Sequence, residues 1–274
     1  MERILVPVDF SDYSKYALEV AAQIAGEKKM QITVLHMIGI SPSRLALNES
    51  EEQKEAEYYM DLAKKHFAKF LNEDFLKGVK LELMVQNYKI FSEINAIVRE
   101  HHIDLVVMGS HGESGLLDSF VGSNTEKVVR TSDIPVLVVK KKISNFKLDS
   151  LVFAWNFKEE ILNVYKRAKK FADFFSARLY PVYVNRPTLN FKSDKELTSE
   201  IDEIQKEINL TEEVVIYSDY SVEKGVLHYA EKIHADAVVI PTHGRRGLAH
   251  FFLGSIGEDI ANRANIPVIT FKTH

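Results

Sequence analysis

The first half of the chain contains a glycine-spaced loop whose residue types suit the binding of phosphate. Gly109 and Gly112 follow the apolar run 105–108, and after nine intervening residues Gly122-Ser123 directly precedes a helical pattern. Glycine lets the backbone approach a ligand closely. A helix N-terminus offers unpaired N–H groups and a favourable dipole to an anion. A buried strand, a glycine loop and a helix start therefore predict a phosphate site here.

The spacing of this loop separates it from two better-known phosphate loops. A Walker A motif would place Gly-Lys before Ser or Thr, and a dinucleotide fingerprint would place its glycines directly after the first strand. The loop also lacks the lysine, arginine or general base that phosphoryl transfer uses. Its acidic residues, Glu113 and Asp118, would repel phosphate unless a metal ion bridges them. We therefore expect a site that holds phosphate with little or no turnover.

Short apolar runs alternate with helical patterns along the chain, and these elements must position the loop. In the first half we predict strands at 4–8, 32–37, 79–85, 105–108 and 136–139. In the second half we predict strands at 151–155, 179–184, 214–216, 237–240 and 268–271. A long charged helix is predicted from Glu49 to about Leu76. Strands that alternate with helices indicate parallel sheets covered by helices on both faces.

The second half repeats the first, which indicates two domains of the same fold. Asp104 to Gly112 aligns with Asp236 to Gly244, and Gly122-Ser123 aligns with Gly254-Ser255, always 132 positions apart. A repeat of this kind indicates successive copies of one structural unit. The predicted segments are a first domain at 1–142, a linker at 143–149 and a second domain at 150–274.

Three positions around the loop are altered in the second copy. Val8, Asp9 and Gly109 align with Trp155, Asn156 and Pro241, respectively. Proline has no backbone N–H, and an asparagine side chain accepts fewer hydrogen bonds than a carboxylate. Tryptophan adds bulk at the end of the strand. We therefore expect the first copy to bind an anionic ligand and the second to bind it weakly or not at all.

Taken with two further features, the loop resembles that of the universal stress protein family. These features are Asp9 at the end of the first predicted strand and the run Val34-Leu35-His36-Met37 on the second. Both copies have the same order of motifs, so the resemblance covers nearly the whole chain and points to a tandem member. It implies two tandem doubly wound α/β domains, each a five-stranded parallel sheet in the order 3-2-1-4-5 with helices on both faces.

The resemblance also implies roles for individual residues in ATP binding, because the glycine motif is typical of the ATP-binding members. Asp9 would hold the ribose hydroxyls, Val8 would line the base pocket, and the backbone of Met37 would meet the adenine edge. The contacts to ribose and phosphates would come from Gly109, Gly112, Gly122, Ser123, Asn124 and Thr125. Mg²⁺ would be carried by the phosphates rather than by protein side chains.

The resemblance therefore implies an ATP-binding regulatory protein of the stress response, with the adenine nucleotide in the first domain. A slow ATPase or a nucleotidyl transferase is an alternative, and so is a scaffold whose second domain binds a partner protein or an apolar ligand. The apolar strands 136–139 and 268–271 would be edge strands, which invite pairing. We therefore expect the two domains to pair within the chain, with a homodimer as a further option.

The composition narrows the class of protein. The net charge of −4 over 274 residues argues against a general nucleic-acid binder. The absence of cysteine excludes disulfides and thiolate catalysis. No apolar stretch reaches the roughly 18 residues that a membrane-spanning helix needs. We expect a soluble cytoplasmic protein.

Overall fold

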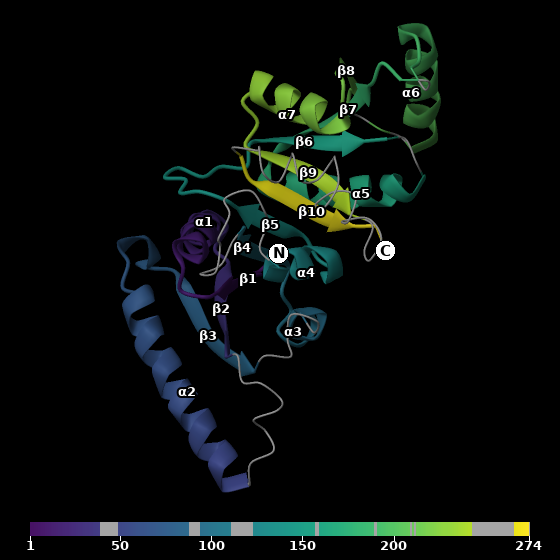
Figure 1. Ribbon diagram of the computed structural model, residues 1–274. Coiled ribbons are helices and arrows are strands. Elements are labelled where there is room, and N and C mark those ends of the chain that lie inside the picture. Colours follow the sequence, from purple (N-terminus) through teal and green to yellow (C-terminus); the bar gives the residue numbers. More distant parts are fainter. Residues whose placement is uncertain are drawn as a thin grey trace. The chain divides into compact units, whose positions relative to one another are not determined.

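The computed structural model divides the chain into two compact units. Its described residues are 1–38, 49–87, 94–110, 123–156, 159–188, 191–208, 210, 212–242 and 266–273. Within these residues, the N-terminal unit ends at Phe146 and the C-terminal unit begins at Lys147. Each unit alternates strands with helices (Figure 1).

The N-terminal unit is built on a parallel sheet. Its elements are β1 (Arg3–Val8), α1 (Asp12–Lys28), β2 (Gln31–Ile38), α2 (Glu49–Phe70), the 3-10 helix η2 (Asp74–Leu76), β3 (Lys80–Asn87), α3 (Ile94–Glu100), β4 (Leu105–Gly109), α4 (Ser123–Thr131) and β5 (Val136–Val139). The strands lie in the order β3-β2-β1-β4-β5, and their described pairs are parallel.

The C-terminal unit repeats this arrangement. Its elements are β6 (Ser150–Trp155), α5 (Glu159–Phe175), β7 (Arg178–Asn185), α6 (Asp194–Ile208), β8 (Val215–Ser218), α7 (Val222–Lys232), β9 (Ala237–Thr242) and β10 (Val268–Lys272). Its strands lie in the order β8-β7-β6-β9-β10 and again pair in parallel. Numbered within the unit, this is the same order, 3-2-1-4-5.

A buried strand and a capped helix build the start of the N-terminal unit. Ile4, Leu5 and Val6 of β1 are fully buried, as expected for a central strand that is covered on both faces. Helix α1 begins after Ser11, whose hydroxyl accepts a hydrogen bond from the Ser14 N–H. The helix then packs against β1 and β4, so it supports the two strands between which the order reverses.

Successive residues of β6 show that helices cover both faces of the sheet. Val152 packs in a cluster with Val226 and Ala230 of α7. The next residue, Phe153, contacts Tyr165 of α5, with ring centroids 5.5 Å apart. Because successive side chains of a strand point to opposite faces, α7 and α5 lie on opposite faces of the sheet. This doubly wound arrangement confirms the predicted fold class.

One predicted helix boundary is wrong. The charged helix that the sequence extends to about Leu76 ends at Phe70 in α2, and η2 follows separately. Beyond Phe70, the Asn72 N–H bonds to the Lys69 carbonyl and the Leu76 N–H bonds to the Glu73 carbonyl, so the chain makes tighter turns of the 3-10 type. Leu76 is nevertheless buried, which explains why the apolar pattern continues to this residue.

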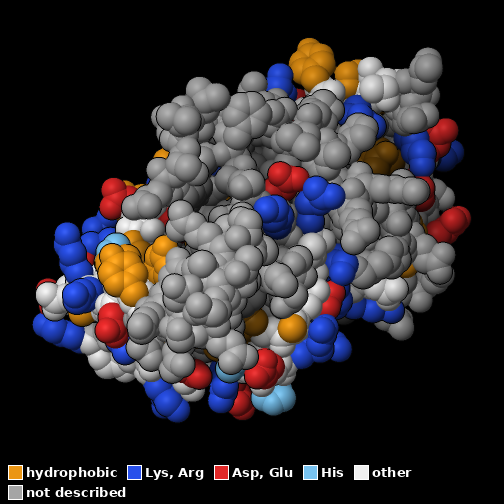
Figure 2. All heavy atoms as spheres, turned by 60° about the horizontal axis from the view of Figure 1, so that its bottom comes forward, with side chains coloured by type: hydrophobic (Ala, Val, Ile, Leu, Met, Phe, Trp, Pro, Cys, Tyr) orange, Lys and Arg blue, Asp and Glu red, His pale blue; other side chains and the backbone are white. Residues whose placement is uncertain are grey.

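The surface carries charges of both signs. On the face shown in Figure 2, Lys and Arg side chains lie among Asp and Glu side chains, with hydrophobic groups in small clusters between them. A search of the described helices finds none with the length and apolar character needed to cross a membrane.

Candidate functional site

The strand order of the N-terminal unit reverses between β1 and β4, and the described pairing of these strands covers their first residues. Ile4 pairs with Leu105 and Leu5 pairs with Val106. The last three residues of each strand extend beyond these pairs. In doubly wound sheets, ligands bind where the order reverses, outside the C-terminal strand ends. We call the C-terminal ends of β1, β4 and β5, with the residues that follow them, the switch edge.

Gly109 lies at the switch edge with its N–H directed towards the β1 side of β4. The N–H groups of Val106 and Ser110 donate to the carbonyls of Pro135 and Val139, on the β5 side. Because the N–H groups of alternate residues in a strand point to opposite neighbours, the Gly109 N–H points the other way. It lies beyond the last β1–β4 pair, where a ligand at the switch edge would meet it.

Gly109 also has a packing role that the sequence did not indicate. A Cβ atom at this position would lie 2.7 Å from both the carbonyl carbon and the carbonyl oxygen of Tyr13 in α1. The backbones of β4 and α1 therefore approach each other so closely that no larger residue fits without a shift. The absence of a side chain at Gly109 serves the fold as well as any ligand.

Asp9 follows β1 directly, as predicted, and is tied to the start of α1. Its Oδ1 atom accepts hydrogen bonds from the Ser11 N–H at 3.1 Å and from the Ser11 hydroxyl at 2.6 Å. Ser11 is in turn the N-cap of α1. The carboxylate is therefore held in place by the helix start, half-buried at the switch edge.

Val8 and Met37 lie on the adjacent strands β1 and β2, which a hydrogen bond from the His36 side chain joins. The Nδ1 atom of His36 lies 2.9 Å from the carbonyl oxygen of the buried Val8. Since a carbonyl only accepts, Nδ1 carries the proton. The Phe10 ring rests against His36, with centroids 4.3 Å apart, and Phe10 adopts a φ of 66°, in the left-handed region that bulky residues rarely occupy. Met37, next to His36, is half-buried.

The predicted phosphate-binding residues of the loop are only partly described. Gly112 and Gly122 lie outside the described residues. Ser123 is the first residue of α4, and the Asn124 side chain is exposed. The Thr125 hydroxyl is buried and donates a hydrogen bond of 2.8 Å to the Gly109 carbonyl. Thr125 therefore fixes the start of α4 to the end of β4. Because its hydroxyl proton is used in this bond, Thr125 would contact a phosphate through its backbone N–H.

Lys140 is a functional candidate that the sequence reasoning missed. It follows β5, whose last residue Val139 pairs with Gly109. Its ammonium nitrogen is buried and has no hydrogen-bond partner in the described part of the chain. Burial lowers the pKa of this ammonium from 10.5 to about 8. An unpaired buried cation is costly unless an anion neutralises it. The run Lys140-Lys141-Lys142 gave no signal of this, because burial depends on the tertiary fold.

The corresponding edge of the C-terminal unit has a different chemistry. Pro241 is buried within β9 beyond the last β6–β9 pair, Phe153 with Val239, so it offers no N–H where Gly109 offers one. Asn156 is exposed. Trp155 is buried against Phe153 and Tyr165, with 4.7 Å between the centroids of the Trp155 and Tyr165 rings. The indole ring of Trp155 therefore packs against α5.

Two further polar groups are buried near the C-terminal ends of β8 and β9 in this unit. The Oε1 atom of Glu223, in the first turn of α7, and the hydroxyl oxygen of Thr242, at the end of β9, are buried. Neither atom has a hydrogen-bond partner among the described residues. Glu223 follows β8, the outermost strand of this unit, whereas Thr242 ends β9 next to the strand reversal. In the described ranges, no group of three or more His, Cys, Asp or Glu residues could hold a metal ion.

The chain matches the model of the universal stress protein family twice, at residues 1–140 and 149–272. Universal stress protein MJ0577 of Methanocaldococcus jannaschii is 30% identical over 163 residues, covering 52% of this chain and 97% of that protein. Universal stress protein Slr1230 of Synechocystis is 20% identical over 294 residues, covering 99% of this chain and 100% of that protein.

A solved structure gives the same result for the fold. The crystal structure of a universal stress protein from Archaeoglobus fulgidus covers 99% of this chain and 98% of its own, with a TM-score of 0.67 and 20% identity. At this identity the likeness concerns the fold alone. The two successive matches to the family model nevertheless span nearly the whole sequence, and the chain therefore belongs to the universal stress protein family as a tandem member.

Proposed function

We propose that the N-terminal unit binds ATP at the switch edge and acts as a nucleotide-dependent regulator. The observation that carries this proposal is the buried, unpartnered ammonium of Lys140, a residue that directly follows the β5 partner of Gly109. A triphosphate would supply the anion that this cation lacks. The N–H of Gly109, which lies beyond the last β1–β4 pair, would supply a further donor. The start of α4 adds the positive end of a helix dipole.

The base and ribose of the nucleotide would lie towards β1 and β2. An ionised carboxylate such as Asp9 can accept hydrogen bonds from both hydroxyls of a ribose. Val8 and Met37 stand at the ends of adjacent strands, where their backbone and apolar side chains suit an adenine ring. Gly112, Gly122, Ser123 and Asn124 complete the proposed phosphate contacts, and any Mg²⁺ would be held by the phosphates.

The direct test is titration calorimetry of the purified chain with ATP, alongside mass spectrometry of any nucleotide released on denaturation. We expect about one ATP per chain. Asp9→Asn is the sharpest variant, because the amide oxygen can still accept the Ser11 hydrogen bonds while the charge is lost. Its ATP affinity should fall about tenfold or more. Asp12→Asn, an exposed change in the first turn of α1, is the matched control and should have no effect.

An unchanged affinity in Asp9→Asn would remove the ribose role, and two equal ATP sites would contradict the proposed asymmetry between the units. Gly109→Pro, the substitution that copies the C-terminal unit, is a poor test because a side chain here meets the Tyr13 backbone. The native chain should release phosphate from ATP in the steady state no faster than the Asp9→Asn variant does. Faster release would favour the enzyme alternative.

A further inference from the structure

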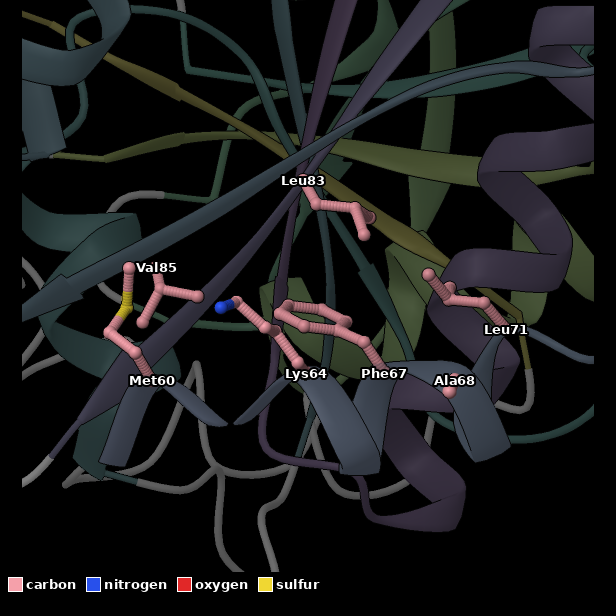
Figure 3. Close-up of a pocket in the computed structure, with 7 residues that line it drawn as sticks. All are labelled: Met60, Lys64, Phe67, Ala68, Leu71, Leu83 and Val85. Atoms are coloured by element: carbon pink, nitrogen blue, oxygen red, sulfur yellow. The ribbon is translucent and has the colours of Figure 1, made fainter. Parts of the chain in front are cut away.

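An apolar pocket lies between α2 and β3, and one of its lining residues, Phe67, contacts Phe10 beside the switch edge, with ring centroids 5.3 Å apart. It has a volume of about 510 Å³, and its lining residues are Met60, Lys64, Phe67, Ala68, Leu71, Leu83 and Val85. Figure 3 shows the α2 side chains facing Leu83 and Val85 across it. The volume is within the range of about 300–1,000 Å³ that small-molecule sites occupy. The pocket is therefore large enough for a ligand of modest size.

The sequence of α2 explains why this face is apolar. The lining positions on the helix are 60, 64, 67 and 68, and Leu71 directly follows its end. This spacing places them on one side of a helix of 3.6 residues per turn. Met60 is 42% exposed and Leu83 is 52% exposed. These side chains are apolar yet only half covered by the N-terminal unit itself. A contiguous exposed apolar surface of this kind marks a binding site more often than a single exposed residue does.

Lys64 supplies the one charge among the lining residues. In Figure 3 its nitrogen extends from α2 towards the β3 side of the pocket. Its ammonium lies 3.1 Å from Asp61 Oδ1, but both side chains of this pair are about 70% exposed, at 71% and 69%. Exposed pairs of this kind contribute little to stability and are readily exchanged. A ligand carboxylate could take the place of Asp61 while its chain is covered by apolar side chains.

We propose that the α2–β3 pocket binds an apolar monocarboxylate, with the carboxylate at Lys64 and the hydrocarbon chain running towards Leu71 and Leu83. The chemical class follows from the charge complementarity with Lys64 and from the otherwise apolar lining. The seven-residue rise from Lys64 to Leu71 spans about 10 Å along the helix, which suits a saturated chain of roughly eight methylenes. Decanoate is therefore the probe of choice.

The experiment is titration calorimetry of the full chain with decanoate, decanol and decyltrimethylammonium. We expect one saturable decanoate site per chain, weaker binding of decanol and no competition from the cationic probe. Lys64→Gln should weaken decanoate at least fivefold and leave decanol unchanged. The neighbouring exposed Lys65, which does not line the pocket, provides the control Lys65→Gln, which should leave both affinities unchanged.

The apolar part of the site is tested with a second matched pair. Leu83→Gln changes a half-exposed lining residue and should weaken decanoate and decanol alike, whereas Leu62→Gln changes an exposed leucine of α2 outside the pocket and should weaken neither. Far-ultraviolet circular dichroism confirms that each variant is folded. A lack of saturable decanoate binding, or equal affinities in Leu83→Gln and the native chain, would overturn the proposal. A dimer in sedimentation that Leu83→Gln dissociates, without decanoate binding, would assign the face to a second copy instead.

Discussion

The two units share one strand order but differ in the polar groups that they bury near the C-terminal ends of their strands. Among the described residues, the Lys140 ammonium after β5 is buried without a partner in the N-terminal unit, whereas in the C-terminal unit the Oε1 atom of Glu223, in the helix after β8, is one of the buried atoms without a partner. Gly109 and Pro241 add a second contrast, because one offers an N–H beyond the last strand pair and the other does not. The comparison teaches that a duplicated fold can be kept while the chemistry of its edge diverges.

The largest expected effect comes from removing the buried cation. Lys140→Met should lower the ATP affinity of the chain by about 10- to 150-fold, since a hydrogen bond to a charged group contributes about 1.5–3 kcal/mol and the triphosphate would lose its buried counter-ion. Titration calorimetry measures the loss. Lys141→Met, an exposed neighbour, is the control and should be nearly neutral. Equal affinity in Lys140→Met and the native chain would break the contrast between the two edges.

The same variant should be more stable than the native chain when no ligand is present. The lowering of the Lys140 pKa from 10.5 to about 8 corresponds to an unfavourable burial of about 3 kcal/mol for the charged form. We therefore expect Lys140→Met to raise the free energy of unfolding by about 2–3 kcal/mol at pH 7, measured by urea denaturation. A loss of stability would mean that the ammonium is well solvated or paired.

The pH dependence follows from the same lowered pKa. Between pH 8 and 10.5 the folded native chain binds fewer protons at Lys140 than the unfolded chain, so its stability rises with pH across this window. The advantage of Lys140→Met is therefore full below pH 8 and vanishes near pH 10.5. The ATP affinity of the native chain should instead fall above pH 8, because the ammonium loses its charge. Parallel trends in stability and affinity would contradict this assignment.

A smaller effect on stability is expected from a change in α5, the helix that follows the first strand of the C-terminal unit. In the C-terminal unit, the Tyr165 hydroxyl of α5 donates a hydrogen bond of 2.6 Å to Glu212, and burial together with Glu212 raises the pKa of Tyr165. Tyr165→Phe should lower the free energy of unfolding by about 1 kcal/mol and leave ATP affinity unchanged. Tyr220→Phe, at a residue 83% exposed, is the control. A change in ATP affinity would show that the units do not act independently.

The smallest expected effect is the outcome of restoring the altered positions. Asn156→Asp with Pro241→Gly returns two residues of the C-terminal edge to those of the N-terminal one. We expect calorimetry still to show one ATP site per chain, because no buried, unpartnered lysine is described at this edge. A second ATP site in this double variant would show that the two altered positions alone account for the difference.

The sequence predicted most of the fold, because its signals are local. Apolar runs separated by helical patterns identified the strands, and the repeat showed that the second half follows the first. The end of α2 was missed because Leu76 is buried and so continues the apolar pattern beyond Phe70. Helical periodicity does not distinguish one long helix from a helix followed by a buried turn.

The site was predicted less completely, because its remaining features depend on contacts between distant segments. Asp9 and Gly109 lie at the two predicted strand ends. The hydrogen bond from Thr125 to Gly109 and the close approach of Gly109 to Tyr13 join residues far apart in the sequence. The burial of Lys140 is likewise a property of the folded chain. No spacing rule reports any of these three features.

The segment that leaves the N-terminal unit is bonded to a side chain of α1. Gln23 donates from Nε2 to the Ile143 carbonyl at 3.1 Å and accepts from the Phe146 N–H at 2.8 Å. Phe146 is itself buried. The family match, however, stops at residue 140. The N-terminal unit therefore extends beyond the segment that matches the family model. A first half severed at residue 140 would leave Gln23 without its partners at Ile143 and Phe146.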